Sequence, residues 1–216
     1  MLKPSNYKHI IWDWNGTLID DAWLFVEVMN KLLKKYDLRE ITIDKYKDIF
    51  GFPIKNYYKK LGFNTEKNLF EKLGLEFIKE YEKRLFDATL YPLTKIILSK
   101  LSALEIKHHI LSASHQKLLN DQIKYYKIKK YFSHISGLNN YFANSKIDEG
   151  IKLVKKMKVD DKDILFIGDT IHDFEVASEL NIDCLLISHG HHSHSRLLQT
   201  NNKVMLNMEN IINELL

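Results

Sequence analysis

Carboxylate and amide side chains follow two separate apolar segments of this chain. One apolar run ends on Asp13, and Asn15 follows two positions later in a turn that contains glycine. A second run is followed by Asp169, with Asp173 four positions further on. Two carboxylates that meet at neutral pH repel one another unless a cation lies between them. Oxygen ligands in small number suit Mg²⁺, so these residues predict a magnesium site if the fold brings them together.

A hydroxyl group and an ammonium group follow other segments of the same kind. Ser112 and Ala113 come directly after an apolar run, and Lys146 stands at the start of an amphipathic pattern. Together with a metal ion, such groups can bind the oxygens of a phosphoryl group. An aspartate that faces a phosphoryl group can attack it and form an aspartyl-phosphate. The residues therefore favour phosphoryl-transfer chemistry.

The elements that must position these residues alternate along the chain. Short apolar runs bounded by glycine, serine or acidic residues predict buried strands. Between them, apolar residues recur at three- and four-residue spacings, which predict amphipathic helices. This alternation indicates an α/β fold with a Rossmann-like parallel sheet, and ligands of such sheets bind at the carboxyl ends of the strands. The predicted strands are 8–13, 107–111, 131–135, 163–167 and 184–187.

A purely helical segment interrupts this alternation. Residues 19–88 show several helical patterns and no convincing strand, and Asp20 and Asp21 precede the first helix as N-terminal acids should. We therefore expect a core made of residues 1–18 and 89–216 and an inserted helical cap of residues 19–88.

The polar residues and their order along the chain resemble the haloacid dehalogenase-like hydrolases, and in particular the phosphoglycolate-phosphatase-like group. The resemblance covers nearly the whole chain, and the helical segment matches the position of the family's first cap. Its four motifs are similar to Asp13-Trp14-Asn15-Gly16-Thr17, to Ser112, to Lys146 and to Gly168-Asp169-Thr170-Ile171-His172-Asp173.

The resemblance implies a role for each of these residues. Asp13 would be the nucleophile and a Mg²⁺ ligand, together with the carboxylates of Asp169 and Asp173 and the backbone carbonyl of Asn15. Lys146 would bind phosphoryl oxygens and restrain Asp13. The residues expected to bind the substrate are Thr17, Ser112, Ala113 and Lys146.

Asn15 departs from the pattern of the phosphatases. There the second acidic residue of the first motif protonates the leaving group, and an amide cannot do this. General acid–base help is worth about 10²- to 10⁴-fold, so the loss matters for alkoxide leaving groups and matters little for stable anions. We therefore expect acyl, aryl or anhydride phosphates as substrates, or a borrowed proton carrier such as His115 or His172.

Two other functions remain open on the sequence. A protein that keeps the phosphate site without the acid could be a phosphate-binding protein with weak or no turnover. Members of the family that cleave C–P or C–halogen bonds also lack this acid, although the retained Asp169 and Asp173 argue against a metal-free dehalogenase. The expected substrate is a small phosphorylated metabolite, and the cap segment Phe50–Lys55 is the expected specificity element, with Lys55 available to an anionic tail.

Structural explanations compete with the catalytic ones at several positions. Ser112 or Ser114 could cap a helix, Asp169 and Asp173 could be first-turn acids, and Lys146 could be a surface lysine. The histidines of the segment His189–His194 could bind a metal, but the segment lacks fixed ligand spacing and more readily lines the core near the active site.

Composition excludes several classes of protein. The chain has 216 residues with 45% hydrophobic content and a net charge of +4, which is ordinary for a globular protein. No basic stripe predicts nucleic-acid binding, and no apolar window reaches the ~18 residues of a membrane span. The one cysteine allows no intrachain disulfide. We expect a cytoplasmic monomer or homodimer.

Overall fold

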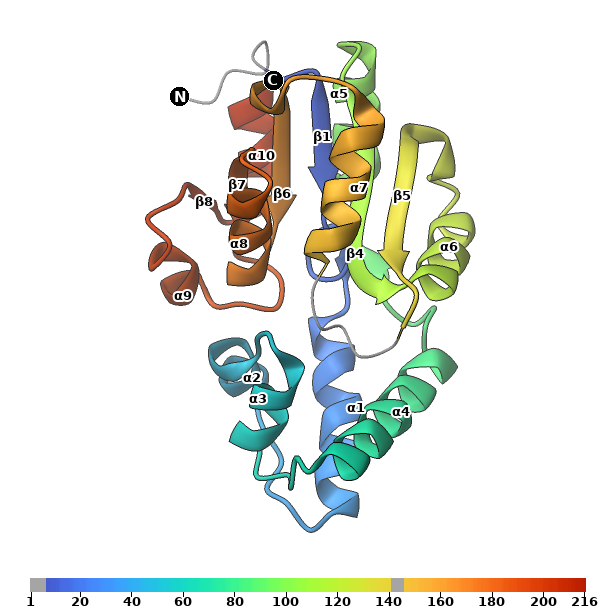
Figure 1. The fold of residues 1–216 in the computed structure, drawn as a ribbon, viewed down its shortest axis with the longest axis vertical. Coiled ribbons are helices and arrows are strands. Elements are labelled where there is room, and N and C mark those ends of the chain that lie inside the picture. Colours follow the sequence, from blue (N-terminus) through green and yellow to red (C-terminus); the bar gives the residue numbers. More distant parts are fainter. Residues whose placement is uncertain (1–6, 141–145) are drawn as a thin grey trace.

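A parallel sheet forms the centre of the protein in a computed structural model, which describes residues 7–140 and 146–216 (Figure 1). Its six strands lie in the order β5-β4-β1-β6-β7-β8, and each neighbouring pair is parallel. This arrangement confirms the predicted α/β class. The strands are β1 (His9–Trp12), β4 (Lys107–His115), β5 (Phe132–Leu138), β6 (Ile164–Gly168), β7 (Asp183–Ile187) and β8 (Val204–Met205).

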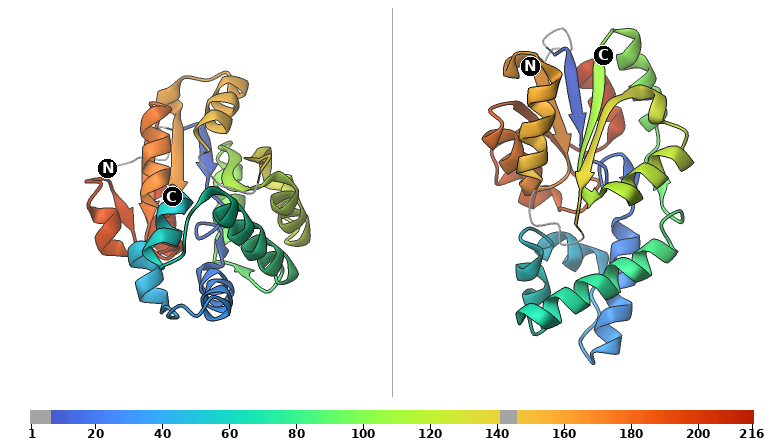
Figure 2. Two further views of the ribbon diagram at one scale, coloured as in Figure 1. Left: turned by 60° about the horizontal axis from the view of Figure 1, so that its bottom comes forward. Right: turned by 45° about the vertical axis from the view of Figure 1, so that its right-hand side comes forward.

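Helices cover both faces of the sheet, as its apolar strands require. Alternate residues of a strand point to opposite faces, so Ile10 and Trp12 join one apolar cluster and Ile11 joins the other. Buried side chains of α7 and α8 belong to the cluster of Ile11, and those of α5, α6 and α10 belong to the opposite cluster. Figure 2 shows helices on both faces of the sheet. The helices are α5 (Thr94–Ala103), α6 (Gln116–Tyr125), α7 (Ile147–Met157), α8 (Ile171–Glu179), α9 (His194–Leu198) and α10 (Met208–Leu215), with short 3₁₀ turns at Lys129–Tyr131 and Asp161–Asp163.

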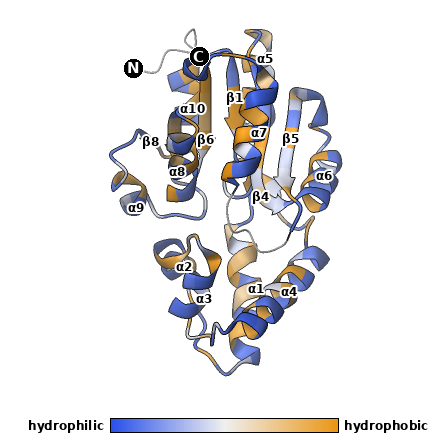
Figure 3. Ribbon diagram, viewed as in Figure 1, coloured by the Kyte–Doolittle hydropathy of each residue, from blue (hydrophilic) through white to orange (hydrophobic). Residues whose placement is uncertain are grey.

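The register of the central strands aligns their carboxyl ends. Trp12 pairs with Ile110 of β4 on one side and with Ile167 of β6 on the other. Asp13 therefore leaves the sheet at the same edge as the ends of β4 and β6. The central strands β1 and β6 are strongly hydrophobic, whereas β5 contains polar residues (Figure 3).

Four helices form a separate layer beyond this edge of the sheet (Figure 1). They are α1 (Ala22–Lys35), α2 (Ile43–Ile49), α3 (Ile54–Lys60) and α4 (Lys67–Lys83). Two short antiparallel strands, β2 (Ile19–Asp20) and β3 (Thr89–Leu90), pair where the chain enters and leaves this layer. The predicted boundaries at residues 18/19 and 88/89 fall at this ribbon. The expectation that residues 19–88 contain no strand was wrong at Ile19 and Asp20, because two residues are too few to show a period.

Other elements differ from the sequence prediction in extent. β4 continues through Ser112 to His115, and β5 continues to Leu138, so both strands are longer than their apolar runs. The segment after β7 adds α9, β8 and α10, which had no predicted counterpart. Within the described residues, no helix is both long enough and apolar enough to cross a membrane.

Candidate active site

Asp13 lies in a buried ionic network with Lys146 and Asp173. The Lys146 ammonium is 2.5 Å from Asp13 Oδ1 and 2.6 Å from Asp173 Oδ1, and it also donates to the carbonyl of Leu111 at 3.1 Å. Lys146 is only 2% exposed, so the alternative that it is a surface lysine is wrong. Burial opposes its charge, but the two carboxylates raise the pKa of Lys146 above its ordinary value. The lysine thus joins the end of β1 to the start of α8.

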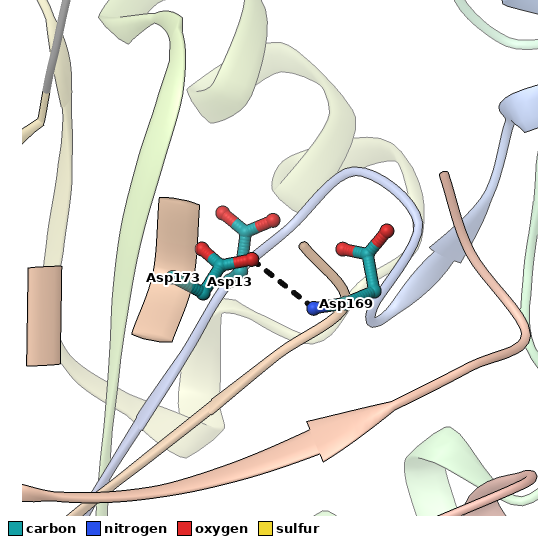
Figure 4. Close-up of side chains that lie close together, drawn as sticks. All are labelled: Asp13, Asp169 and Asp173. Atoms are coloured by element: carbon teal, nitrogen blue, oxygen red, sulfur yellow. Dashed lines mark hydrogen bonds between the residues drawn. The ribbon is translucent and has the colours of Figure 1, made fainter. Parts of the chain in front are cut away.

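Three buried carboxylates meet at this edge of the sheet (Figure 4). Asp13, Asp169 and Asp173 each offer one oxygen, and these oxygens lie within 4.8 Å of one another. Burial raises the pKa of Asp13 to about 8, although Lys146 opposes the effect, and burial likewise raises the pKa of Asp169 to about 6. A cation among the three would offset both effects, so the donor set fits a divalent metal ion.

Asp169 is oriented by the loop that follows β1 and by the loop that follows β7. The Thr17 hydroxyl donates to Asp169 Oδ1 at 2.9 Å, and the backbone N–H of His191 donates to Oδ2 at 2.6 Å. Gly16 has φ +73°, and a Cβ there would lie 2.3 Å from Asp169 Oδ2. Thr17 itself does not line the cavity above Asp13. Thr17 supports Asp169 from beneath, and the expectation that it binds substrate stays a prediction.

Asp173 combines a structural role with its place beside Lys146. Its side chain accepts from the backbone N–H groups of Asp169 and Thr170, at 3.1 and 2.8 Å, and forms a capping box with Thr170 at the start of α8. Burial disfavours its charge, but Lys146 and the Thr170 hydroxyl hold the pKa of Asp173 below its ordinary range. The predicted role as a first-turn acid and the predicted role in the acidic cluster are both present in this one side chain.

Ser112 and Ala113 line the same cavity as Asp13. Ser112 is 1% exposed, and its hydroxyl accepts from the backbone N–H of Ser114 at 3.1 Å. The helix that follows begins at Gln116 and has no side-chain cap. The alternative that Ser112 or Ser114 caps this helix is therefore wrong.

The side chain of Asn15 is held on both sides by hydrogen bonds. Its Oδ1 accepts from the Ser114 hydroxyl at 2.5 Å, and its Nδ2 donates to Asp21 Oδ2 at 2.5 Å and to the Tyr81 hydroxyl at 3.2 Å. Asp21 is fully buried and also accepts from the Gly16 N–H at 3.0 Å. Its side chain makes no helix cap, so its predicted capping role was wrong. The side-chain amide of Asn15 therefore faces the carboxylate of Asp21 and not the solvent.

His191 lies at the candidate site, and no motif in the sequence predicted its position there. Its Nε2 lies 3.3 Å from Asp21 Oδ1, and its Nδ1 lies 2.7 Å from the Tyr46 hydroxyl of the cap. Its ring lines the cavity with Asp13 and Asn15. The density of histidines after β7 was a signal, but 170 residues separate His191 from Asp21, and no local pattern links them.

The neighbouring histidines support the site and do not form a metal centre of their own. Among the described residues, the single group arranged to hold a metal is the aspartate trio. His189 stacks on Tyr91, and His192 accepts from the N–H of Ile171 at 3.1 Å. His115 and His172, expected as candidate proton carriers, both line the cavity. Burial lowers the pKa of His172, and its ring stacks on Phe52 at 4.4 Å.

The cap closes the cavity above Asp13. Phe50, Phe52 and Ile54 of the predicted specificity segment line it. Lys55 is exposed and is not among the lining residues, so its expected contact with a substrate tail is corrected. α3 begins at Ile54, and its first turn directs successive side chains to different sides.

Comparisons with solved structures find the same fold over almost the whole chain. A haloacid dehalogenase-like family hydrolase from Streptococcus pneumoniae is 19% identical, with a TM-score of 0.81 and coverage of 97% of this chain and 98% of that chain. A protein described as a predicted phosphoglycolate phosphatase from Haemophilus somnus is 18% identical, with a TM-score of 0.77 and coverage of 96% and 97%. A predicted phosphatase from Clostridium acetobutylicum is 17% identical, with a TM-score of 0.78 and coverage of 95% and 96%.

Comparisons of the sequence with known proteins and protein families identify the family. No curated protein matches the chain. A family model described as haloacid dehalogenase-like hydrolase matches residues 10–187. This range contains Asp13, Ser112, Lys146, Asp169 and Asp173, which the structure gathers at one edge of the sheet. The chain therefore belongs to the haloacid dehalogenase-like hydrolases.

Proposed function

We propose that this protein is a Mg²⁺-dependent phosphatase that hydrolyses a small phosphorylated metabolite through an aspartyl-phosphate on Asp13. The observation that carries the proposal is the placement of a nucleophile, a buried cation and an acidic cluster at one end of one cavity. Asp13 Oδ1 is paired with Lys146, and Oδ2 makes no hydrogen bond to any described residue. The ion pair with Lys146 favours the ionised form of the Asp13 carboxylate, which is the form that attacks phosphorus.

The chemistry has two steps on Asp13. A carboxylate oxygen of Asp13 bonds to phosphorus while the bond from phosphorus to the leaving-group oxygen breaks. A water molecule then attacks phosphorus, releases inorganic phosphate and restores the Asp13 carboxylate. Mg²⁺ held by Asp13, Asp169 and Asp173 would neutralise phosphoryl charge, and the Asn15 carbonyl would be a further ligand. Ser112 and Lys146 border the same cavity and supply polar donors for phosphoryl oxygens.

The first step lacks a proton donor at the position of Asn15. Since the amide of Asn15 donates to Asp21 and its carbonyl oxygen accepts from Ser114, neither end of the side chain carries a transferable proton. A leaving group that departs as a stable anion needs none. Acyl and aryl phosphates therefore suit the site better than alkyl phosphates do.

Phosphate release from acetyl phosphate and p-nitrophenyl phosphate tests the proposal. We expect turnover with Mg²⁺, none with a chelator, and a loss on the order of 10³-fold or more in Asp13→Asn. Asp37→Asn, at an exposed position of the cap, is the matched control and should retain activity. No turnover on either substrate, with Mg²⁺-dependent binding of phosphate, would identify a phosphate-binding protein instead.

A further inference from the structure

The cavity above Asp13 has two kinds of wall. The wall formed by the core carries the polar and ionic side chains described above. The wall formed by the cap is aromatic, and its rings include Phe25, Phe50, Phe52, Tyr57, Phe77 and Tyr81. Over the described residues, the cap contributes no charged side chain to this lining. The part of a substrate beyond its phosphoryl group therefore meets an apolar surface.

Phe25 packs edge to face with Phe50 and Tyr81 and lies tilted against Phe77. Its ring centroid lies 5.3 Å from that of Phe77 and 5.0 Å from that of Tyr81. Aromatic rings favour such offset and perpendicular contacts with another ring. The cavity measures about 140 Å³, and an apolar protein cavity of about 150 Å³ holds one benzene molecule. This volume also has to hold the phosphoryl group above Asp13, so the leaving group can be no larger than about one ring.

The charges around the cavity disfavour an anionic tail. Lys146 is the one lysine or arginine among the described lining residues, and Asp13 and Asp173 already pair with it. A carboxylate elsewhere in the substrate would be buried in the cavity without a lysine or arginine to pair with, which is costly. A phosphate monoester that carries a free carboxylate, such as phosphoglycolate, therefore fits this cavity poorly.

One polar atom in the aromatic wall lacks a partner. The hydroxyl of Tyr57 is buried and has no hydrogen bond to any described residue, and Tyr57 is 3% exposed. An unpaired buried hydroxyl destabilises a protein. Tyr57 is also one of the residues that line the cavity, so its hydroxyl is a polar group available to a ligand there.

We infer that the substrate is a phosphate whose leaving group carries an aromatic ring, either an aryl phosphate or an aromatic acyl phosphate. The inference rests on the proposed function and deepens it. Two independent features agree on this class. The aromatic wall selects the ring, and Asn15 selects a leaving group, such as a phenolate or an aromatic carboxylate, that departs without a proton.

A pair of acyl phosphates with similar leaving-group acidity tests the ring alone. We expect kcat/KM for benzoyl phosphate to exceed that for acetyl phosphate by on the order of 10- to 100-fold, because the ring leaves water for the apolar wall. Equal or lower kcat/KM for benzoyl phosphate would overturn the inference and leave the proposed phosphatase intact. Cyclohexanecarbonyl phosphate should rank between the two, and a higher rank than benzoyl phosphate would contradict an aromatic preference.

Variants of the cap locate the preference in the cavity. Phe52→Ala should lower the benzoyl-to-acetyl ratio, whereas Phe52→Leu, which keeps apolar volume and protects folding, should lower it less. Leu75→Ala truncates an apolar side chain on α4 that is 51% exposed, and this control should keep the ratio of the parent. An unchanged benzoyl-to-acetyl ratio in Phe52→Ala would show that the aromatic wall does not cause the preference.

A binding measurement separates the inference from the proposed function. Benzylphosphonate and ethylphosphonate have no P–O ester bond for a phosphatase to cleave, and benzylphosphonate carries a phenyl group where ethylphosphonate carries a methyl group. Calorimetric titration in the presence of Mg²⁺ should give tighter binding of benzylphosphonate, by on the order of tenfold or more. If the protein hydrolyses no phosphate yet shows this preference, the phosphatase proposal fails and the aromatic site stands. Equal binding of the two phosphonates would overturn the inference even in an active enzyme.

Discussion

The surroundings of Asn15 in the structure change how the absence of an acidic residue at this position is interpreted. In sequence it leaves an empty acid–base position, but in the structure its Nδ2 faces the buried carboxylate of Asp21 at 2.5 Å. An aspartate at position 15 would place two carboxyl groups together, and like charges at that distance cannot both ionise. The pair would share a proton, and one of the two carboxyl groups would have a raised pKa.

Asn15→Asp should therefore add a proton donor to the cavity. We expect kcat/KM for alkyl phosphates to rise relative to aryl phosphates by on the order of 10²-fold, toward the usual value of acid–base help. The double variant Asn15→Asp, Asp21→Asn restores one carboxyl and one amide and serves as the control for charge. The same alkyl-to-aryl ratio in parent and variant would show that position 15 does not limit the leaving group.

Lys146 supplies the positive charge of the buried ionic network, and the stability of the fold depends on it. It is buried between Asp13 and Asp173, so Lys146→Met would leave two buried carboxylates without a cation. We expect a loss of about 3–5 kcal/mol in the free energy of unfolding, measured by urea denaturation in the presence of a chelator. Asp13→Asn combined with Lys146→Met should recover part of the loss. If the losses in the free energy of unfolding of the two single variants simply add in the double variant, the interaction between Asp13 and Lys146 does not stabilise the fold.

At the scale of elements, β4 carries buried histidines into the core. Trp12 donates to His108 Nδ1 at 3.0 Å, and His108 Nε2 lies 3.2 Å from the carbonyl of Leu98 in α5. These contacts use the neutral ring, with Nδ1 accepting and Nε2 donating. Burial lowers the pKa of His108 from 6.5 to about 4. The packing of α5 on β4 thus depends on a histidine that stays uncharged.

This histidine should make the fold sensitive to acid. Between pH 6.5 and 4 the unfolded chain binds a proton at His108 that the folded protein excludes. Its stability contribution is therefore present above pH 6.5 and is lost as pH falls toward 4, by at most about 1.4 kcal/mol per pH unit. His108→Gln keeps an acceptor and a donor without titrating. Urea denaturation at several pH values should show a shallower acid loss in this variant, and parallel curves would exclude the effect.

At the scale of the whole molecule, the cap and the core are joined across the cavity by the segment after β7. Arg196 of α9 donates to the carbonyls of Lys47 and Phe50, both at 2.7 Å. Lys47 in turn donates to the carbonyl of His189 at 3.1 Å. These contacts tie α2 and the start of the specificity segment to the core. They hold the aromatic wall over the catalytic edge of the sheet.

Loss of Arg196 should loosen the cap without unfolding the core. Each charge-assisted hydrogen bond contributes about 1.5–3 kcal/mol, so Arg196→Gln should expose α2 to faster amide hydrogen exchange and raise KM. Exchange in β1 and β6 should stay as in the parent. Arg39→Gln, at an exposed position of the cap, is the matched control. Unchanged exchange in α2 would show that other contacts hold the cap closed.

The sequence by itself determined the kind of fold and predicted which polar residues would come together. Short apolar runs and three- and four-residue spacings are local patterns, so they predicted the central strands and the cap helices with small errors at their ends. The predicted residues Asp13, Ser112, Lys146, Asp169 and Asp173 meet at one edge because parallel strands share their carboxyl ends. The two-residue strands β2, β3 and β8 escaped prediction because they are too short to show a period, whereas α10 buries Met208, Ile211 and Leu215 at helical spacing and could have been predicted.

Only the tertiary structure decided what surrounds these groups. The contacts of Asn15 with Asp21, of Asp21 with His191 and of His191 with Tyr46 join segments up to 170 residues apart. The aromatic wall likewise depends on which faces of four cap helices point inward. Contacts of this kind follow from packing and burial, which act across the whole chain, and a local pattern of residue types does not encode them.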